Sequence, residues 1–163
     1  MEADEYQVQP LVRAGGRVLG FSGAYAYRSG EVDREWLSVR ATIEEFLTDR
    51  HAIGAFALGQ FTNRSEETDG EEQIWLGGQY RYHHHFDERA SIYAGPSIGL
   101  AYFDDKTASG TAFAWGVSAG FRYWVSPRAA FTIEPTYLRA EFSDEDGGPT
   151  DDVLLLWGFA FSL

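Results

Sequence analysis

Three consecutive histidines, His83, His84 and His85, are the first residues of this chain that could do chemistry. Imidazole is a frequent metal ligand, but neighbouring side chains of a strand point to opposite faces, so a regular strand cannot direct all three rings to one ion. The chain has no cysteine, and no spaced carboxylates near the run complete a ligand set. We interpret the run as a solvated turn, and we expect no metal site and no cofactor.

A second candidate is the acidic run at 144–148, which reads Asp-Glu-Asp-Gly-Gly. It resembles part of a calcium-binding loop, but it lacks the spaced oxygen ligands and the closing glutamate of an EF-hand. We therefore expect a hydrated, mutually repulsive surface here rather than a calcium site.

Three serines, Ser91, Ser97 and Ser118, lie at positions expected to face an interior. A hydrolase requires a nucleophile in contact with a base and an orienting acid. The available histidines, His51 and the run at 83–85, are expected at the turn end of the strands rather than at the height of these serines. The sequence therefore predicts no enzymatic activity.

Charged residues at inward positions are the most specific polar feature. Each lies on the face of its strand that otherwise carries small or polar side chains, and Gln79 shares that face. Buried charges must pair, so we expect a cluster of ion pairs that fills and blocks the interior, with a gate or proton path as the alternative. The predicted cluster consists of Arg40, Glu44, Arg81, Arg122 and Glu134.

The geometry of one hairpin predicts a specific ion pair within this cluster. If the chain turns at 126–127, Arg122 lies opposite Thr132 and Glu134 lies opposite Gly120. Arg122 and Glu134 are then diagonal neighbours on the inner face, within reach of long side chains. Gly120 provides space for the arginine head group.

The elements that carry these residues are best seen at 112–142, where two alternating runs flank a Ser-Pro turn. Phe113, Trp115 and Val117 share one face, and the residues between them are small or polar. Large apolar residues on one face and small residues on the other invert the pattern of a soluble core. A barrel in lipid requires this inversion.

The same alternation predicts an all-β single domain, an eight-stranded antiparallel up-and-down transmembrane β-barrel that is a monomer. An even number of strands returns both termini to one side, and no apolar run is long enough for a transmembrane helix. The predicted strands are 11–28, 36–47, 52–63, 73–83, 90–103, 112–125, 129–142 and 153–163.

The connections between these strands alternate in length and charge. Those at 48–51, 84–88 and 125–128 are short, and the other four are longer and acidic. Short turns at one end and long outer loops at the other are typical of outer-membrane barrels. The acidic residues of the long connections are Glu31, Asp33, Glu35, Glu66, Glu67, Asp69, Glu71, Glu72, Asp104, Asp105, Asp144, Glu145, Asp146, Asp151 and Asp152.

The composition excludes several classes of function. A net charge of −12 argues against nucleic acid as a partner, and the absence of cysteine excludes a disulfide scaffold. No signal peptide precedes Glu2, so we expect an exported protein in its mature form with an added Met1.

Three stretches carry a resemblance to a known family. They are IEEFLTDRHAIGAFALG at 43–59, GFRYWVSPRAAFTIEPTYL at 120–138 and the terminal LWGFAFSL. From about residue 11 onward the chain resembles the small eight-stranded outer-membrane barrels of Gram-negative bacteria, the OmpA/OmpX-like type. The resemblance implies insertion in the outer-membrane bilayer and folding by the barrel-assembly machinery. Such barrels usually end on an aromatic residue, whereas this chain ends on Leu163.

We expect a structural role for the barrel, with a lumen filled by side chains, no wide pore and acidic extracellular loops. One alternative is a surface-binding or adhesion barrel that acts through its loops. Another is a lipid-modifying enzyme, although the lipid-facing histidine and serine on one strand of the family's lipid A deacylases have no counterpart in this sequence. A third is a soluble ligand-binding barrel such as a lipocalin, whose aromatic residues would face inward.

Overall fold

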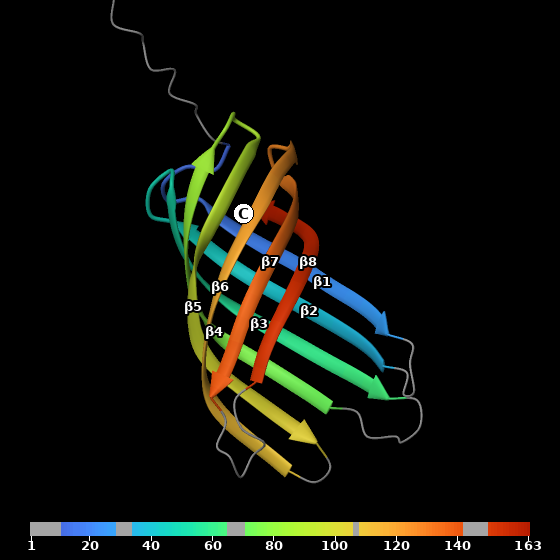
Figure 1. Ribbon diagram of the computed structural model, residues 1–163. Helices are drawn as coiled ribbons and strands as arrows, with labels where there is room; N and C mark the ends of the chain where they lie inside the picture. Colours follow the sequence, from blue (N-terminus) through green and yellow to red (C-terminus); the bar gives the residue numbers. More distant parts are fainter. Residues whose placement is uncertain (1–10, 29–33, 65–70, 106–107, 142–149) are drawn as a thin grey trace, which may run out of the picture.

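Alternation of large and small side chains produces extended strands, and these strands close into a barrel. The computed structural model describes residues 11–28, 34–64, 71–105, 108–141 and 150–163 (Figure 1). Each strand pairs antiparallel with its neighbour in sequence, and the last pairs with the first. This confirms the predicted up-and-down barrel. The strands are β1 (Arg17–Arg28), β2 (Arg34–Phe46), β3 (His51–Arg64), β4 (Glu71–His85), β5 (Ala90–Asp105), β6 (Ala108–Ser126), β7 (Ala129–Glu141) and β8 (Thr150–Ser162).

The described part of the chain contains no helix with the length and hydrophobicity needed to cross a membrane.

Large apolar side chains face outward, as the alternation predicts. On β6, Phe113 and Val117 are 55% and 51% exposed, whereas Ala112 and Ala114 are buried. This orientation contradicts the lipocalin alternative, in which the aromatic face would line the interior. The same exposure recurs around the barrel at Phe21, Val39, Ile43, Leu76, Ile98, Leu100, Leu155, Trp157 and Phe159.

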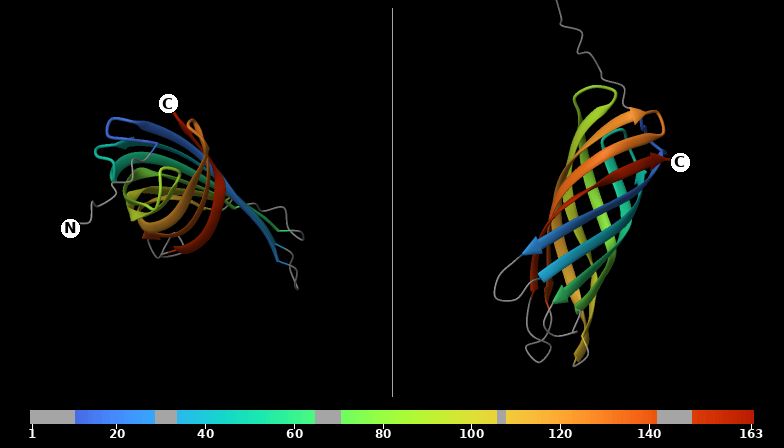
Figure 2. Two further views of the ribbon diagram at one scale, coloured as in Figure 1. Left: turned by 90° about the horizontal axis from the view of Figure 1, so that it is seen from above. Right: turned by 90° about the vertical axis from the view of Figure 1, so that its right-hand side faces the viewer.

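The connections at 47–50, 86–89 and 127–128 lie at one end of the barrel and the other four lie at the opposite end (Figures 1 and 2). The long connection predicted between 103 and 112 is wrong, because β5 continues to Asp105 and β6 begins at Ala108, with Asp105 opposite Ala108. The start of β1 and the end of β8 meet at the turn end, where the Leu163 amide donates to the carbonyl oxygen of Arg17 at 3.0 Å. The strand ends that flank 29–33, 65–70, 106–107 and 142–149 lie at the opposite end. The calcium-like run at 144–148 and most of the acidic loop residues lie outside the described residues.

The first strand begins at Arg17, six residues later than predicted. Gly15 adopts a positive φ of 81°, which a residue with a side chain rarely adopts, and it forms a tight turn before the strand. The Gly15 amide donates to the carbonyl oxygen of Phe46, and the Phe46 amide donates to that of Gly16. Residues 11–16 therefore fold against the turn end of the barrel, where Val12 is buried.

The seam between β1 and β8 is shorter than every other strand pairing. The two strands pair only from Val18 opposite Ser162 to Gly23 opposite Trp157, whereas β1 pairs with β2 over its full length. Beyond Gly23 and Trp157 the strands separate toward the end with the long connections (Figure 1). Closure of the barrel is therefore incomplete at this end.

We expect Val117→Arg to impair insertion into lipid vesicles and Ser118→Ala to leave it unchanged. Val117 is outward and half exposed, and a lipid-facing arginine at the bilayer midplane costs about 2–4 kcal/mol. Ser118 has the inward parity of its strand, so its substitution is the matched control. The folded fraction can be measured by the heat-dependent shift in electrophoretic mobility, and equal yields would show that the two faces are assigned in reverse.

Candidate functional site: a charge cluster in the lumen

Five charged side chains point into the lumen from four strands. Inward positions of an eight-stranded barrel converge on a space that side chains alone can fill. Each of the five is at most 6% exposed. They are Arg40 and Glu44 on β2, Arg81 on β4, Arg122 on β6 and Glu134 on β7, and we refer to them as the charge cluster.

The carboxylate of Glu134 is one centre of the charge cluster. Arg81 Nη2 donates to its two oxygens at 2.9 and 2.7 Å, and Arg40 Nη1 donates to Oε1. The hydroxyl of Tyr93 donates to Oε2 at 2.7 Å, and that of Thr136 donates to Oε1 at 3.2 Å. These bonds to a charged acceptor offset its loss of hydration inside the barrel.

The carboxylate of Glu44 is the second centre. It accepts hydrogen bonds from Arg81 Nη1, from Gln79 Nε2 at 3.1 Å and from Arg122 Nη2 at 2.9 Å. The Gln79 oxygen in turn accepts from Arg40 Nη2 at 2.6 Å. Arg81 therefore bridges both carboxylates, and Gln79 links the two centres a second time.

The partner of Arg122 differs from the predicted one. Its position opposite Thr132 is confirmed, but its guanidinium donates to Glu44 on the far side of the barrel, whereas Glu134 is held by two other arginines. A long side chain in a narrow lumen reaches strands that are distant in the sheet. The register of a single hairpin contains no information on such contacts.

Tyr93 occupies the space that was expected to hold an arginine. A Cβ atom on Gly120 would lie 2.4 Å from Tyr93 Cζ, so only glycine accommodates this ring. The guanidinium carbons of Arg81 and Arg122 lie 4.6 and 5.3 Å from the ring centroid, within the range of cation–π contacts. Tyr93 thus supports two cations through its ring and one anion, Glu134, through its hydroxyl.

Apolar side chains border the charge cluster on both sides. Toward the short turns lie Val12, Val18, Phe46, Ala52, Trp124, Ala130 and Ala160. Toward the long connections lie Phe56, Leu58, Trp75, Ala101, Ala112, Ala114, Leu138 and Ala140. The cavity among the charged groups has a volume of about 20 Å³, close to the minimum that holds one water molecule.

The charge cluster carries more positive than negative charge. Three guanidinium groups face two carboxylates, which leaves a formal charge of +1 when all five are ionised. Within the described part of the chain, Arg122 Nη1 has no hydrogen-bond partner. Both carboxylates, by contrast, accept several bonds and are the groups whose loss would disturb the network most.

His83 is buried, which corrects the prediction of a solvated turn at the histidine run. Strand pairing continues to the end of β4, with His83 opposite Tyr93, so alternate histidines point in and out. The His83 ring lies 4.8 Å from that of Phe46 and 5.1 Å from that of Tyr93, while His84 is exposed. Among the described residues, no group of three or more His, Cys, Asp or Glu side chains could hold a metal ion.

Ser91 lies directly opposite His85, so the expectation that the inward serines lack a neighbouring histidine is wrong at this position. His85 Nε2 is 2.7 Å from the carbonyl oxygen of Asp49, to which it donates, and Ser91 is 2% exposed. A buried hydroxyl beside an imidazole held by the backbone does not form an accessible nucleophile. Ser97 is also buried, in the loop half of the lumen.

The chain is similar in structure to several outer-membrane proteins of known structure. Neisserial surface protein A is 13% identical, with a TM-score of 0.73 over 92% of this chain and 98% of that chain. OprG from Pseudomonas aeruginosa is 12% identical, with a TM-score of 0.58 over 95% and 99%. Ail, the attachment invasion locus protein of Yersinia pestis, is 12% identical, with a TM-score of 0.51 over 91% and 97%.

These likenesses confirm that the fold is that of the small eight-stranded outer-membrane barrels, as the sequence resemblance indicated. No protein-family model and no curated protein sequence matches the chain.

We expect strong energetic coupling between Arg122 and Glu44. Removing one partner leaves the other buried and unpaired, which typically costs about 3–5 kcal/mol, so Arg122→Met with Glu44→Gln should cost less than the sum of the single substitutions. The free energy of unfolding in detergent, followed by urea titration, measures the coupling. The exposed pair Arg17 and Glu45 is the control, with coupling of about 1 kcal/mol or less. Equal coupling for the two pairs would contradict the assignment.

Proposed function

We propose that this chain is an integral protein of the outer membrane of a Gram-negative bacterium, with a structural role. In this proposal the barrel is a wall element whose lumen is blocked by side chains, rather than a wide pore. The observation that carries the proposal is the charge cluster, in which buried, mutually bonded groups lie between two apolar layers inside a barrel with an apolar outer surface.

The outer surface supports placement in a bilayer. Side chains such as Ile98, Leu100 and Trp157 are more than half exposed, and together with their neighbours they would form a large apolar surface in water. A closed sheet satisfies nearly all backbone hydrogen bonds internally, which lipid demands. The protein would be a monomer in contact with lipid, inserted by the barrel-assembly machinery, and its negative charge disfavours nucleic acid.

The distribution of connections supports an orientation. In outer-membrane barrels the short turns face the periplasm and the long loops face outward. The connections at this end and the strand ends beside them contain the 15 acidic residues of the predicted long loops, out of 25 in the chain, so the proposed extracellular end is strongly negative. Such an end resists close approach of other anionic surfaces at low ionic strength.

The proposal includes no enzymatic activity. The Ser91 hydroxyl beside partly exposed His85 is buried, and the charge cluster has no open space for a substrate. The alternative is a surface-binding or adhesion role through the loops, which is favoured by the similarity in fold to a protein called an attachment invasion locus protein.

We predict that the chain needs detergent or lipid to fold. Refolding from urea by dilution should give soluble, β-rich, monodisperse protein in detergent micelles and aggregate in plain buffer. Circular dichroism combined with light scattering measures both outcomes. Monodisperse β-rich protein in plain buffer would overturn the membrane placement.

We further predict that planar-bilayer recordings of the purified protein show no steady, large conductance. The charge cluster and the two apolar layers leave a cavity of only about 20 Å³ at mid-lumen. A wide porin recorded in the same bilayers is the positive control. A steady, large conductance from this chain would contradict a blocked lumen.

A further inference from the structure

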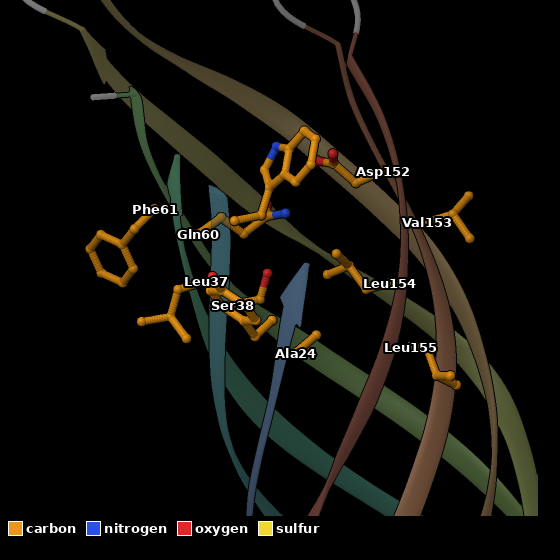
Figure 3. Close-up of a pocket in the computed structure, with 11 residues that line it drawn as sticks. Ala24, Leu37, Ser38, Gln60, Phe61, Asp152, Val153, Leu154 and Leu155 are labelled. Atoms are coloured by element: carbon orange, nitrogen blue, oxygen red, sulfur yellow. The ribbon is translucent and has the colours of Figure 1, made fainter. Parts of the chain in front are cut away.

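The separation of β1 from β8 opens a pocket through the barrel wall. The pocket has a volume of about 440 Å³ and lies where the pairing of the two strands has ended (Figure 3). It is lined from both faces of the wall, because inward Ser38 and Leu154 contribute alongside outward Leu37 and Leu155. Because both faces border it, the pocket joins the outer surface to the upper lumen, by which we mean the half of the lumen away from the short turns.

The outer part of this wall pocket is apolar. Leu37, Phe61, Val153 and Leu155 are all among the exposed large hydrophobic side chains, and they lie at the loop end of the apolar belt. An occupant that enters from the side would therefore pass apolar side chains first. A hydrocarbon chain is suited to this part, because it buries apolar surface on both partners.

The inner part of the wall pocket contains one carboxylate, that of Asp152, and hydrogen-bond acceptors that lack a donor. Asp152 accepts a hydrogen bond from the Gln60 amide, and the two side chains lie close together on the lumen side (Figure 3). In the described part of the chain, Asp152 Oδ2 and Gln60 Oε1 have no hydrogen-bond partner, and neither does Oε1 of Gln73, which lies opposite Gln60 on β4. Buried acceptors that lack a donor are costly, so a cationic donor would be stabilised here.

We propose that the wall pocket binds a membrane-borne amphiphile with one hydrocarbon chain and an ammonium head group. The chain would lie against the outward leucines and Val153, and the head group would donate hydrogen bonds to Asp152 and Gln60. Both unpaired oxygens are buried, so binding would require the carboxylate and the amide to rotate toward the pocket. No arginine or lysine lines the pocket, so an ammonium meets no like charge from its walls.

The height of the pocket favours entry from the outer leaflet. Residues 24–28 of β1 and 150–156 of β8 present backbone groups that do not pair with each other. Unpaired strand edges are not tolerated in hydrocarbon, so this part of the seam must lie at the level of the lipid head groups. An amphiphile at that level already has its head group beside the opening and its chain beside the apolar belt. This placement rests on the proposed membrane location.

The test uses the five tryptophan indole signals of the intact protein in phosphatidylcholine nanodiscs, followed by NMR. Trp36 lines the wall pocket, whereas Trp115 and Trp157 are outward. We add dodecylamine carrying a nitroxide on its chain, or dodecanoic acid with the same label. We expect saturable broadening of the Trp36 signal by the amine alone. The two outward signals should broaden equally with both probes, because both partition into the bilayer.

Two test substitutions, one control substitution and one further probe make the result specific. Asp152→Asn keeps the shape and removes the charge, and it should weaken the apparent affinity for the amine at least about tenfold, the usual worth of a charge-assisted hydrogen bond. Ala24→Phe should fill the pocket and abolish the Trp36 effect, while Ala55→Phe, on the lipid face of β3, should not. The water-soluble nitroxide amine 4-amino-TEMPO, which lacks a chain, should have no effect.

Several outcomes would overturn the proposal. They are equal broadening of Trp36 by amine and acid, an unchanged affinity in Asp152→Asn, and an equal effect of 4-amino-TEMPO, which would indicate access from water. A wrong membrane location would give a different result from a wrong pocket assignment. In that case neither labelled chain would broaden the Trp115 and Trp157 signals.

Discussion

Two carboxylates and three guanidinium groups must neutralise one another inside a lumen that only side chains can fill, and the rest of the barrel depends on this constraint. Glu134 and Glu44 each accept hydrogen bonds from two arginines, and Arg81 bonds to both carboxylates. Since an unpaired buried charge is far more costly than a satisfied one, the strands that carry these groups have little freedom to slide. The charge cluster therefore fixes register across the barrel as well as blocking it.

The alternation of the sequence was sufficient to predict the fold and the five inward charges, because strand parity is a local property. The partner of Arg122 could not be predicted in this way, since Glu44 lies across the lumen on a strand far away in sequence. The burial of His83 was missed because the whole histidine run was interpreted as a solvated turn, although the predicted strand at 73–83 already included His83. Tyr93 was recognisable as inward, but its role follows from Gly120 on the neighbouring strand, which leaves room for its ring.

The seam between β1 and β8 has a paired half and an unpaired half. Closure of the sheet demands continuous pairing, yet the two strands share only the turn-end half of their length. The charge cluster lies beside the paired half, with Arg40, Arg81 and Glu134 lining a common cavity with Ser22 and Ala160. The unpaired half borders the upper lumen, where polar groups such as Asp152 lack full sets of partners. The tightly bonded half of the seam therefore lies toward the short turns, and the open half lies toward the opposite end of the barrel.

The arginines of the charge cluster are buried and bonded to carboxylates in a lumen with almost no space for water. Hydrogen exchange of the arginine side-chain protons, measured by NMR in nanodiscs, tests this directly, with exposed Arg17 as the internal reference. We expect the guanidinium protons of Arg40 and Arg81 to exchange orders of magnitude more slowly than those of Arg17. Exchange of all three at similar rates would show a hydrated, mobile lumen and would contradict a lumen blocked by the charge cluster.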